Sequence, residues 1–126
     1  MQQRVRIMAV DDEPDILNIV KMSLAKWGYE VDAFLDPVVA LDHFSQNASA
    51  YSLILTDIKM PGMSGEELAR RARQTRPDVK VMIMTAFEVD KALKESLPSI
   101  EKDGFLQKPF HTTDVCVAVK KHLDAA

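Results

Sequence analysis

Three aspartates directly follow two short apolar runs, and their side chains suit metal-assisted chemistry. Asp11 and Asp12 follow the run from Val5 to Val10, and Asp57 follows the run from Tyr51 to Thr56. Clustered carboxylates repel one another unless a cation lies among them, and ligands that are all oxygen favour Mg²⁺, with Mn²⁺ as a second choice, over zinc. Mg²⁺ typically binds one or two carboxylates together with a phosphate oxygen. The three aspartates therefore predict a divalent-metal site that handles a phosphoryl group.

Two further side chains match the needs of phosphoryl transfer. Thr85 follows the apolar run from Val79 to Met84, and Lys108 lies just after Leu106. The lysine provides a point charge for one phosphoryl oxygen, and the threonine hydroxyl can donate to another. Phosphoryl transfer requires little beyond in-line positioning and neutralisation of the transferred oxygens, and a carboxylate can serve as its nucleophile.

The segments that must position these residues alternate between strand and helix. Short apolar or β-branched runs predict five strands, at Val5–Val10, Tyr29–Phe34, Tyr51–Thr56, Val79–Met84 and Phe105–Leu106. Helical spacing, with start and stop residues, predicts five helices, at Pro14 to Gly28, Asp36 past Phe44, Ser64 to about Arg76, about Glu88 to Leu97, and Thr113 to Leu123. Ser64, with Glu67 three residues later, predicts a capping box at the third helix.

This alternation predicts an α/β fold with a five-stranded parallel sheet covered by helices on both faces. The expected strand order is 2-1-3-4-5, doubly wound and flavodoxin-like. Ligands bind such sheets beyond the carboxyl ends of the strands, where the order reverses between the first and third strands. That position brings Asp11, Asp12 and Asp57 to one crevice, with Thr85 and Lys108 on the same edge. Each residue alone also has a structural explanation, such as a helix cap or a turn, and their joint placement favours function.

Composition narrows the classes of partner. The chain has 126 residues without a linker or repeat, so residues 1–126 are predicted to form a single domain. A net charge of -3 argues against nucleic acid or an anionic membrane as the main partner. The basic run from Arg70 to Arg76 has no interleaved aromatic residue and is interpreted as a solvated face.

The cysteine and the histidines of the sequence do not suggest a second metal or catalytic site. Cys116 is the single cysteine, which excludes a disulfide within the chain and fits a cytoplasmic protein. No apolar run approaches the roughly 18 residues that predict a membrane span. His43, His111 and His122 lack metal-ligand spacing and are interpreted as surface residues.

Four segments together resemble the receiver domain of two-component response regulators, of the chemotaxis-regulator kind, over essentially the whole chain. They are Val10–Pro14 (VDDEP), Leu55–Gly65 (LTDIKMPGMSG), Met84–Ala86 (MTA) and Phe105–Phe110 (FLQKPF). Each segment is a weak signal alone, but their order and spacing are specific. The resemblance implies a phosphorylated signalling domain, rather than an enzyme with an external substrate, that assists its own Mg²⁺-dependent phosphotransfer and dephosphorylation.

The resemblance also assigns roles at the metal site. Asp57 is expected to accept a phosphoryl group from a histidine kinase or a histidine phosphotransfer protein. Asp12 is expected to bind Mg²⁺ directly and Asp11 mainly through water. The backbone carbonyl of Lys59 is expected to complete the protein ligands. Lys108 is expected to pair with the phosphoryl group.

Four further roles concern switching. The resemblance implies that Thr85 is the switch hydroxyl, that Ala86 leaves room beside the phosphoryl group, and that Pro109 follows a cis peptide bond. Phe105 matches the switch aromatic, which turns inward when Thr85 moves toward the phosphoryl oxygen. The output partner, a protein or an attached domain, is expected to bind the surface of the fourth helix, fifth strand and fifth helix.

One segment departs from the family pattern. Ile100 to Gly104 stands where the family usually has a Gly-Ala pair, and Pro98 interrupts the fourth helical pattern. The stretch from Thr85 to Lys108 is about one residue longer than is usual. The end of the fourth helix and the specificity for an output partner are therefore left open.

Three alternatives also stay open. A Mg²⁺-dependent phosphatase with an aspartate nucleophile would need a second aspartate two residues later, where Lys59 stands. The chain can also be the receiver part of a larger regulator with DNA-binding or enzymatic output. The last alternative is a receiver that binds partners without switching.

Overall fold

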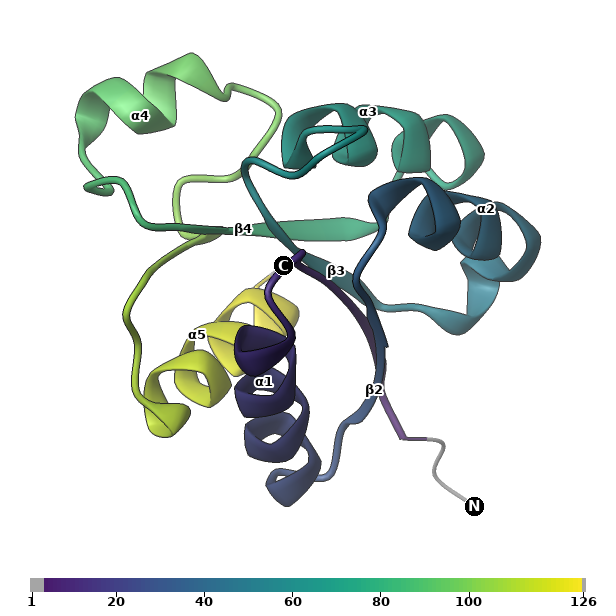
Figure 1. The fold of residues 1–126 in the computed structure, drawn as a ribbon, viewed down its shortest axis with the longest axis horizontal. Coiled ribbons are helices and arrows are strands. Elements are labelled where there is room, and N and C mark those ends of the chain that lie inside the picture. Colours follow the sequence, from purple (N-terminus) through teal and green to yellow (C-terminus); the bar gives the residue numbers. More distant parts are fainter. Residues whose placement is uncertain (1–3, 126) are drawn as a thin grey trace.

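A computed structural model describes residues 4–125, which form five strands and five α-helices around a central sheet (Figure 1). The strands are β1 (Arg6–Val10), β2 (Glu30–Phe34), β3 (Leu53–Asp57), β4 (Lys80–Thr85) and β5 (Phe105–Gln107). Every neighbouring pair is parallel, and the order is β2-β1-β3-β4-β5. The predicted fold class and strand order are confirmed. The predicted domain limits at residues 1 and 126 lie outside the described residues.

Five α-helices surround the sheet, and four of them cover its two faces in pairs. They are α1 (Pro14–Lys26), α2 (Pro37–Asn47), α3 (Gly65–Thr75), α4 (Lys91–Ser96) and α5 (Thr112–Asp124), and a short 3₁₀ turn, η1 (Ala48–Ala50), follows α2. In Figure 1, α1 and α5 lie together on one side of the sheet, and α2 and α3 lie on the other. Pro14 and Pro37 occupy the first turns of α1 and α2, where a missing N–H costs no hydrogen bond.

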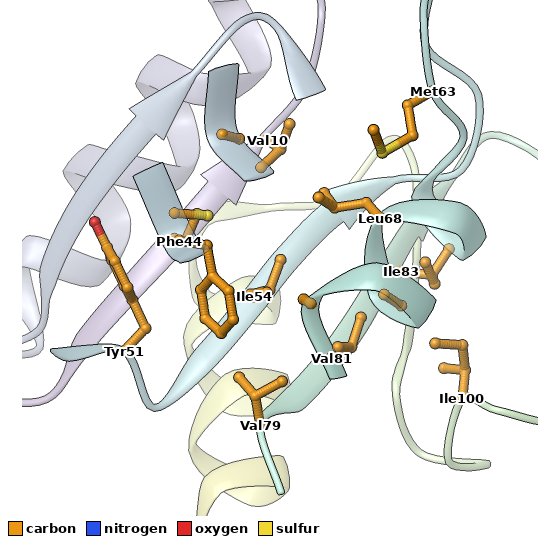
Figure 2. Packing of buried hydrophobic residues seen from close by; sticks show 14 of the residues in the cluster. Val10, Phe44, Tyr51, Ile54, Met63, Leu68, Val79, Val81, Ile83 and Ile100 are labelled. Atoms are coloured by element: carbon orange, nitrogen blue, oxygen red, sulfur yellow. The ribbon is translucent and has the colours of Figure 1, made fainter. Parts of the chain in front are cut away.

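Alternation along the strands divides the core into two clusters. On β1, Met8 and Val10 pack toward α2 and α3, whereas Ile7 and Ala9 pack toward α1 and α5. Figure 2 shows the cluster on the α2 and α3 side, where Phe44 of α2 and Leu68 of α3 meet residues of the sheet. The central strands β1, β3 and β4 are mostly apolar and buried, whereas the edge strand β2 carries Glu30 and Asp32. Polar side chains of the central strands therefore lie mainly at their ends.

The fourth helix is shorter than the predicted span from Glu88 to Leu97. Asp90 caps it by accepting a hydrogen bond from the backbone N–H of Leu93, so Glu88 and Val89 stay in the preceding loop. Leu97 precedes Pro98, which disfavours helical backbone at that position and ends the helix. None of the helical residues of α4 is buried. The sheet holds this segment mainly through Leu97 and Ile100, which follow the helix and join the core.

His122 corrects a prediction, because it is buried rather than on the surface. It follows Val115 and Val119 at helical spacing on the inner face of α5. Its Nδ1 lies 3.2 Å from Oδ1 of Asp103, in the atypical segment before β5. The pair ties the end of α5 to that segment.

The basic run and the capping box also differ in part from expectation. Ser64 accepts from the backbone N–H of Glu67 at 3.1 Å, but the Glu67 carboxylate binds Arg70 and Arg71 rather than completing a capping box. Arg70 and Arg71 lie on an exposed face as predicted. Arg73 and Arg76 are half-buried, because they donate to backbone carbonyls of other segments: Ser99 and Val79 for Arg73, and Ala48 and Tyr51 for Arg76.

The start of α3 lies against the end of β3, and this contact requires a glycine. A Cβ added to Gly65 would overlap the carbonyl oxygen of Asp57 and lie 3.2 Å from Cδ1 of Ile83. We expect Gly65→Ala to lower the free energy of unfolding by about 1–3 kcal/mol, the usual cost of overpacking. Helix propensity favours alanine over glycine by about 1 kcal/mol. A lower stability of Gly65→Ala would therefore come from the steric overlap and not from helix propensity.

Urea unfolding of wild type and Gly65→Ala measures this effect. Gln74→Ala, at an exposed position of the same helix, is the matched control and should change stability by less than about 0.5 kcal/mol. A Gly65→Ala variant as stable as wild type would contradict the proposed close contact.

Candidate functional site

Four carboxylates meet at the carboxyl ends of β1 and β3. These strands are neighbours, and Val10 is paired with Thr56, so the next residues, Asp11 and Asp57, stand side by side. Carboxylate oxygens of Asp11, Asp12, Glu13 and Asp57 all lie within 4.8 Å of one another. Asp11 and Asp57 are buried, whereas Asp12 and Glu13 are exposed. The structure thus brings the three predicted aspartates together and adds a fourth carboxylate.

Glu13 was not among the residues predicted from the sequence. Its position could have indicated it, because Glu13 lies directly after the acidic pair and before the proline that starts α1. Its backbone N–H donates to Oδ1 of Asp11 at 2.9 Å, which holds the Asp11 carboxylate in place. The Glu13 side chain itself lies at the exposed side of the cluster.

Lys108 reaches into the middle of these carboxylates. It follows β5, whose residue Gln107 is paired with Thr85 of β4, and its backbone N–H donates to the Thr85 carbonyl at 2.7 Å. Its Nζ lies 2.8 Å from Oδ2 of Asp11, 3.3 Å from Oδ2 of Asp57 and 3.6 Å from Oε1 of Glu13. One ammonium group therefore faces three of the four negative charges.

Asp11 and Lys108 affect each other's protonation. Burial raises the pKa of Asp11 above its usual value, although hydrogen bonds from Lys108 and from the Glu13 backbone oppose this rise. Burial acts to lower the pKa of Lys108, but the hydrogen bond and the charge of Asp11 outweigh it, so this pKa is raised. Lys108 therefore stays a cation at neutral pH, and it limits the cost of burying Asp11.

Asp57 and Thr85 each make one well-defined local hydrogen bond. Oδ1 of Asp57 accepts from the backbone N–H of Ile58 at 2.8 Å, which leaves Oδ2 facing Lys108. The Thr85 side chain is fully buried, and its Oγ1 accepts from the backbone N–H of Phe87 at 3.0 Å. The hydroxyl thereby fixes the first turn of the loop between β4 and α4.

The other predicted residues lie around this centre in different settings. Ala86 and Pro109 are exposed, and the peptide bond between Lys108 and Pro109 is cis, as the resemblance implied. Phe105 is half-buried against the core cluster on the α2 and α3 side. The ammonium of Lys59 lies 5.0 Å from the centre of the Phe87 ring, a cation–π contact that joins the loops after β3 and β4.

The donor set fits a hard divalent cation. Four carboxylates converge without a histidine or cysteine among them, and this oxygen-only set suits Mg²⁺ or Mn²⁺. The geometry places the Asp57 carboxylate, the Lys108 ammonium and an acidic cluster that could hold a metal ion within a few ångströms of one another. This arrangement can position and neutralise a phosphoryl group.

Comparison with known proteins points to one family. Residues 7–120 match the family described as "Response regulator receiver domain". The chain is 38% identical to the response regulator receiver protein CpdR of Brucella abortus, in an alignment that covers 96% of this chain and 98% of that protein. A CheY-like receiver domain structure from Methanospirillum hungatei shares 32% identity and a TM-score of 0.82, covering 97% of this chain and 95% of that one.

Other similar proteins are longer or more distant. The Vibrio cholerae chemotaxis protein CheY4 is 24% identical with a TM-score of 0.84, over 95% of this chain and 99% of that one, and it supports the fold alone. The sensor kinase CckA of Brucella abortus is 30% identical, but the match covers 94% of this chain and only 12% of that protein. This chain therefore corresponds to only a small segment of that kinase.

The Lys108 contacts predict a pH-dependent stability defect. In metal-free buffer, Lys108→Met should lower the free energy of unfolding at neutral pH by about 3 kcal/mol, because it leaves buried Asp11 without its cation. A carboxyl group whose folded-state pKa is raised binds a proton more readily in the folded state, so its protonation favours folding as the pH falls. The defect should therefore shrink as the pH drops through the folded-state pKa of Asp11.

Urea unfolding across this pH range tests the prediction. Lys120→Met is the control, because Lys120 pairs with Asp124 on the exposed surface of α5, and its loss should cost less than about 1 kcal/mol. A Lys108→Met defect that is absent, or that stays constant with pH, would show that Lys108 does not compensate the charge of Asp11.

Proposed function

Because the chain belongs to the response regulator receiver family, signalling domains whose general mechanism is phosphorylation of an aspartate, we propose that it accepts a phosphoryl group on Asp57. The observation that supports Asp57 most strongly is its position in the site. It ends β3, its Oδ2 lies 3.3 Å from Nζ of Lys108, and it shares the acidic cluster with Asp11 and Asp12.

The proposed donor is a phosphohistidine of a histidine kinase or a histidine phosphotransfer protein. An oxygen of the Asp57 carboxylate attacks the phosphorus, the new O–P bond forms as the P–N bond breaks, and the electron pair leaves with the imidazole. The Ile58 backbone N–H holds Oδ1 of Asp57, which orients the carboxylate for attack. Lys108, already close to Asp57, pairs with an oxygen of the transferred group.

The metal in this proposal is Mg²⁺, with Mn²⁺ as a substitute. Asp12 and Asp57 would bind it directly, Asp11 mainly through water, and the backbone carbonyl of Lys59 would complete the protein ligands. When bound, the ion neutralises charge on the phosphoryl oxygens. Glu13 belongs to the same cluster and would add negative charge at its exposed side.

Switching in this proposal begins at Thr85. Its hydroxyl oxygen now accepts from the Phe87 N–H, and a phosphoryl group on Asp57 offers a stronger partner to which the hydroxyl can donate. Movement of Thr85 toward that group makes room for Phe105, which is half-buried, to turn inward. Bonds that exist only in the phosphorylated arrangement bias the equilibrium between the two states. The output surface consists of α4, β5 and α5, and hydrolysis of the aspartyl-phosphate resets it.

Removal of the acceptor tests the proposal. Asp57→Asn should abolish labelling by acetyl phosphate with Mg²⁺, because an amide is not a competent nucleophile for this transfer. Intact-mass spectrometry would detect the added phosphoryl group. Asp42→Asn, an exposed aspartate of α2, is the control and should be labelled like wild type. Undiminished labelling of Asp57→Asn would refute the assignment.

Removal of a proposed metal ligand gives a second test. Mg²⁺ binds only the folded site in this proposal, so a concentration of about ten times its Kd should stabilise the wild type by about 1.4 kcal/mol. Asp12→Asn should lose most of that gain, whereas Asp15→Asn, in the first turn of α1, should keep it. Thermal unfolding with and without Mg²⁺ measures both variants, and equal stabilisation of the two would exclude Asp12 as a ligand.

A further inference from the structure

A second group of side chains with metal-ligand chemistry lies away from the acidic cluster at Asp57. Carboxylate oxygens of Glu101 and Asp103 and a ring nitrogen of His122 lie within 4.8 Å of one another. The two carboxylates precede β5, in the segment that departs from the family pattern, and the histidine lies in the last turn of α5. The group therefore stands at the amino end of β5, whereas Asp57 stands at the carboxyl end of β3 in the same parallel sheet.

His122 is the member of this group that apolar packing does not explain. The residue is 1% exposed, and its Nδ1 lies 3.2 Å from Oδ1 of Asp103. Its other ring nitrogen, Nε2, is buried and has no hydrogen-bond partner among residues 4–125. Buried polar atoms without a partner are uncommon, and a bound ion is one of their recognised causes. One long hydrogen bond offsets little of the cost of burying an imidazole, so a stronger bond at Nδ1 would account for its place.

The spacing of the three groups suits a tetrahedral metal ion. With bonds of about 2.0–2.1 Å, two ligands of such an ion lie roughly 3.3 Å apart. The 3.2 Å between Nδ1 of His122 and Oδ1 of Asp103 matches that separation. Glu101 is exposed, so its side chain can rotate to close the remaining distance, and water can fill the fourth position. Two carboxylates and a neutral imidazole also balance the charge of a divalent cation.

Hydrogen bonds to the backbone fix both sides of this group. The Gly104 N–H donates to the Glu101 carbonyl at 2.8 Å, which closes a tight turn and keeps Glu101 and Asp103 together. On the other side, the Lys80 ammonium donates to the His122 carbonyl at 2.7 Å and thereby holds the end of α5. The ligands are therefore positioned before any ion binds, as an efficient metal site requires.

We propose that Glu101, Asp103 and His122 bind one Zn²⁺ ion. Nδ1 of His122 gives its lone pair to the ion, and the single proton of the neutral ring then resides on Nε2. The imidazole in this ligand set favours zinc over Mg²⁺, which prefers oxygen ligands alone. A bound ion would join the segment before β5 to the end of α5. This inference does not depend on the proposed function, because the two sites share no residue.

NMR of the histidine ring nitrogens tests the proposal directly. The ¹⁵N-labelled full chain is titrated with ZnCl₂ in excess Mg²⁺, which competes for the acidic cluster at Asp57, where no histidine contributes. The Nδ1 signal of His122 should shift and saturate with one bound ion, while the signals of His43 and His111 stay in place at the same zinc concentration. His122→Asn identifies the signals by their loss. An unchanged His122 signal, or a parallel shift of all three histidines, overturns the proposal.

The carboxylate ligands are tested without disturbing the core. Asp103→Asn and Glu101→Gln should each raise the Kd for Zn²⁺, followed at His122, by about tenfold or more, because even residues that only orient a ligand typically contribute that much. Glu88→Gln, at an exposed position before α4, is the matched control and should leave the Kd within about twofold of wild type. A Kd that neither carboxylate variant changes would exclude both residues as ligands and overturn the proposed site.

Thermal unfolding gives an independent readout of the same site. In excess Mg²⁺, Zn²⁺ at about ten times its Kd should raise the Tm of wild type by about 4 °C or more, because the ion binds only the folded chain. Glu88→Gln should gain as much as wild type, whereas Asp103→Asn should gain less than half. An equal gain in Asp103→Asn would place the stabilising ion elsewhere and overturn the proposal.

Discussion

The contact of one lysine ammonium with two buried carboxylates is the interaction on which the rest of the site depends. Asp11 and Asp57 follow paired residues of neighbouring strands, so the sheet forces their charges together. Lys108, which follows β5, lies within 3.3 Å of both carboxylates. Without a cation, the two buried carboxylates would repel each other in an environment that water reaches only in part, which would lower the stability of the fold. The same arrangement suits an incoming phosphoryl group, because Lys108 can exchange one anionic partner for another.

The fold restricts where such a site can form. Both faces of the sheet are buried by helices, so polar side chains collect where the strands end. The order of the strands reverses between β1 and β3, which opens a crevice at that edge. The close contact between Gly65 and Asp57 adds a further restriction, because it sets α3 directly against the end of β3. Stability and the proposed function thus depend on the same few residues.

Topological reasoning from the sequence was sufficient to predict the sheet order and the meeting of Asp11, Asp12, Asp57 and Lys108. It worked because strand ends are marked by a change from apolar to polar residues, and parallel strands bring those ends together. It failed where contacts between distant segments of the chain determine the burial or position of a residue. His122 was assigned to the surface, although its spacing from Val115 and Val119 places it on the inner face of α5. Glu13 joins the cluster through the local turn after β1, and the end of α4 depends on Pro98 together with the packing of Leu97 and Ile100.

The central claim is that this arrangement directs a phosphoryl group to one carboxylate. The most direct test is to treat the wild-type chain with acetyl phosphate and Mg²⁺, reduce the acylphosphate with borohydride, and locate the modified residue by tandem mass spectrometry of its peptides. Reduction converts a phosphorylated aspartate to homoserine and leaves other residues unchanged. The proposed mechanism predicts homoserine at position 57 alone. Homoserine at Asp11 or Asp12, or a stable phosphoryl group on a serine or threonine, would contradict it.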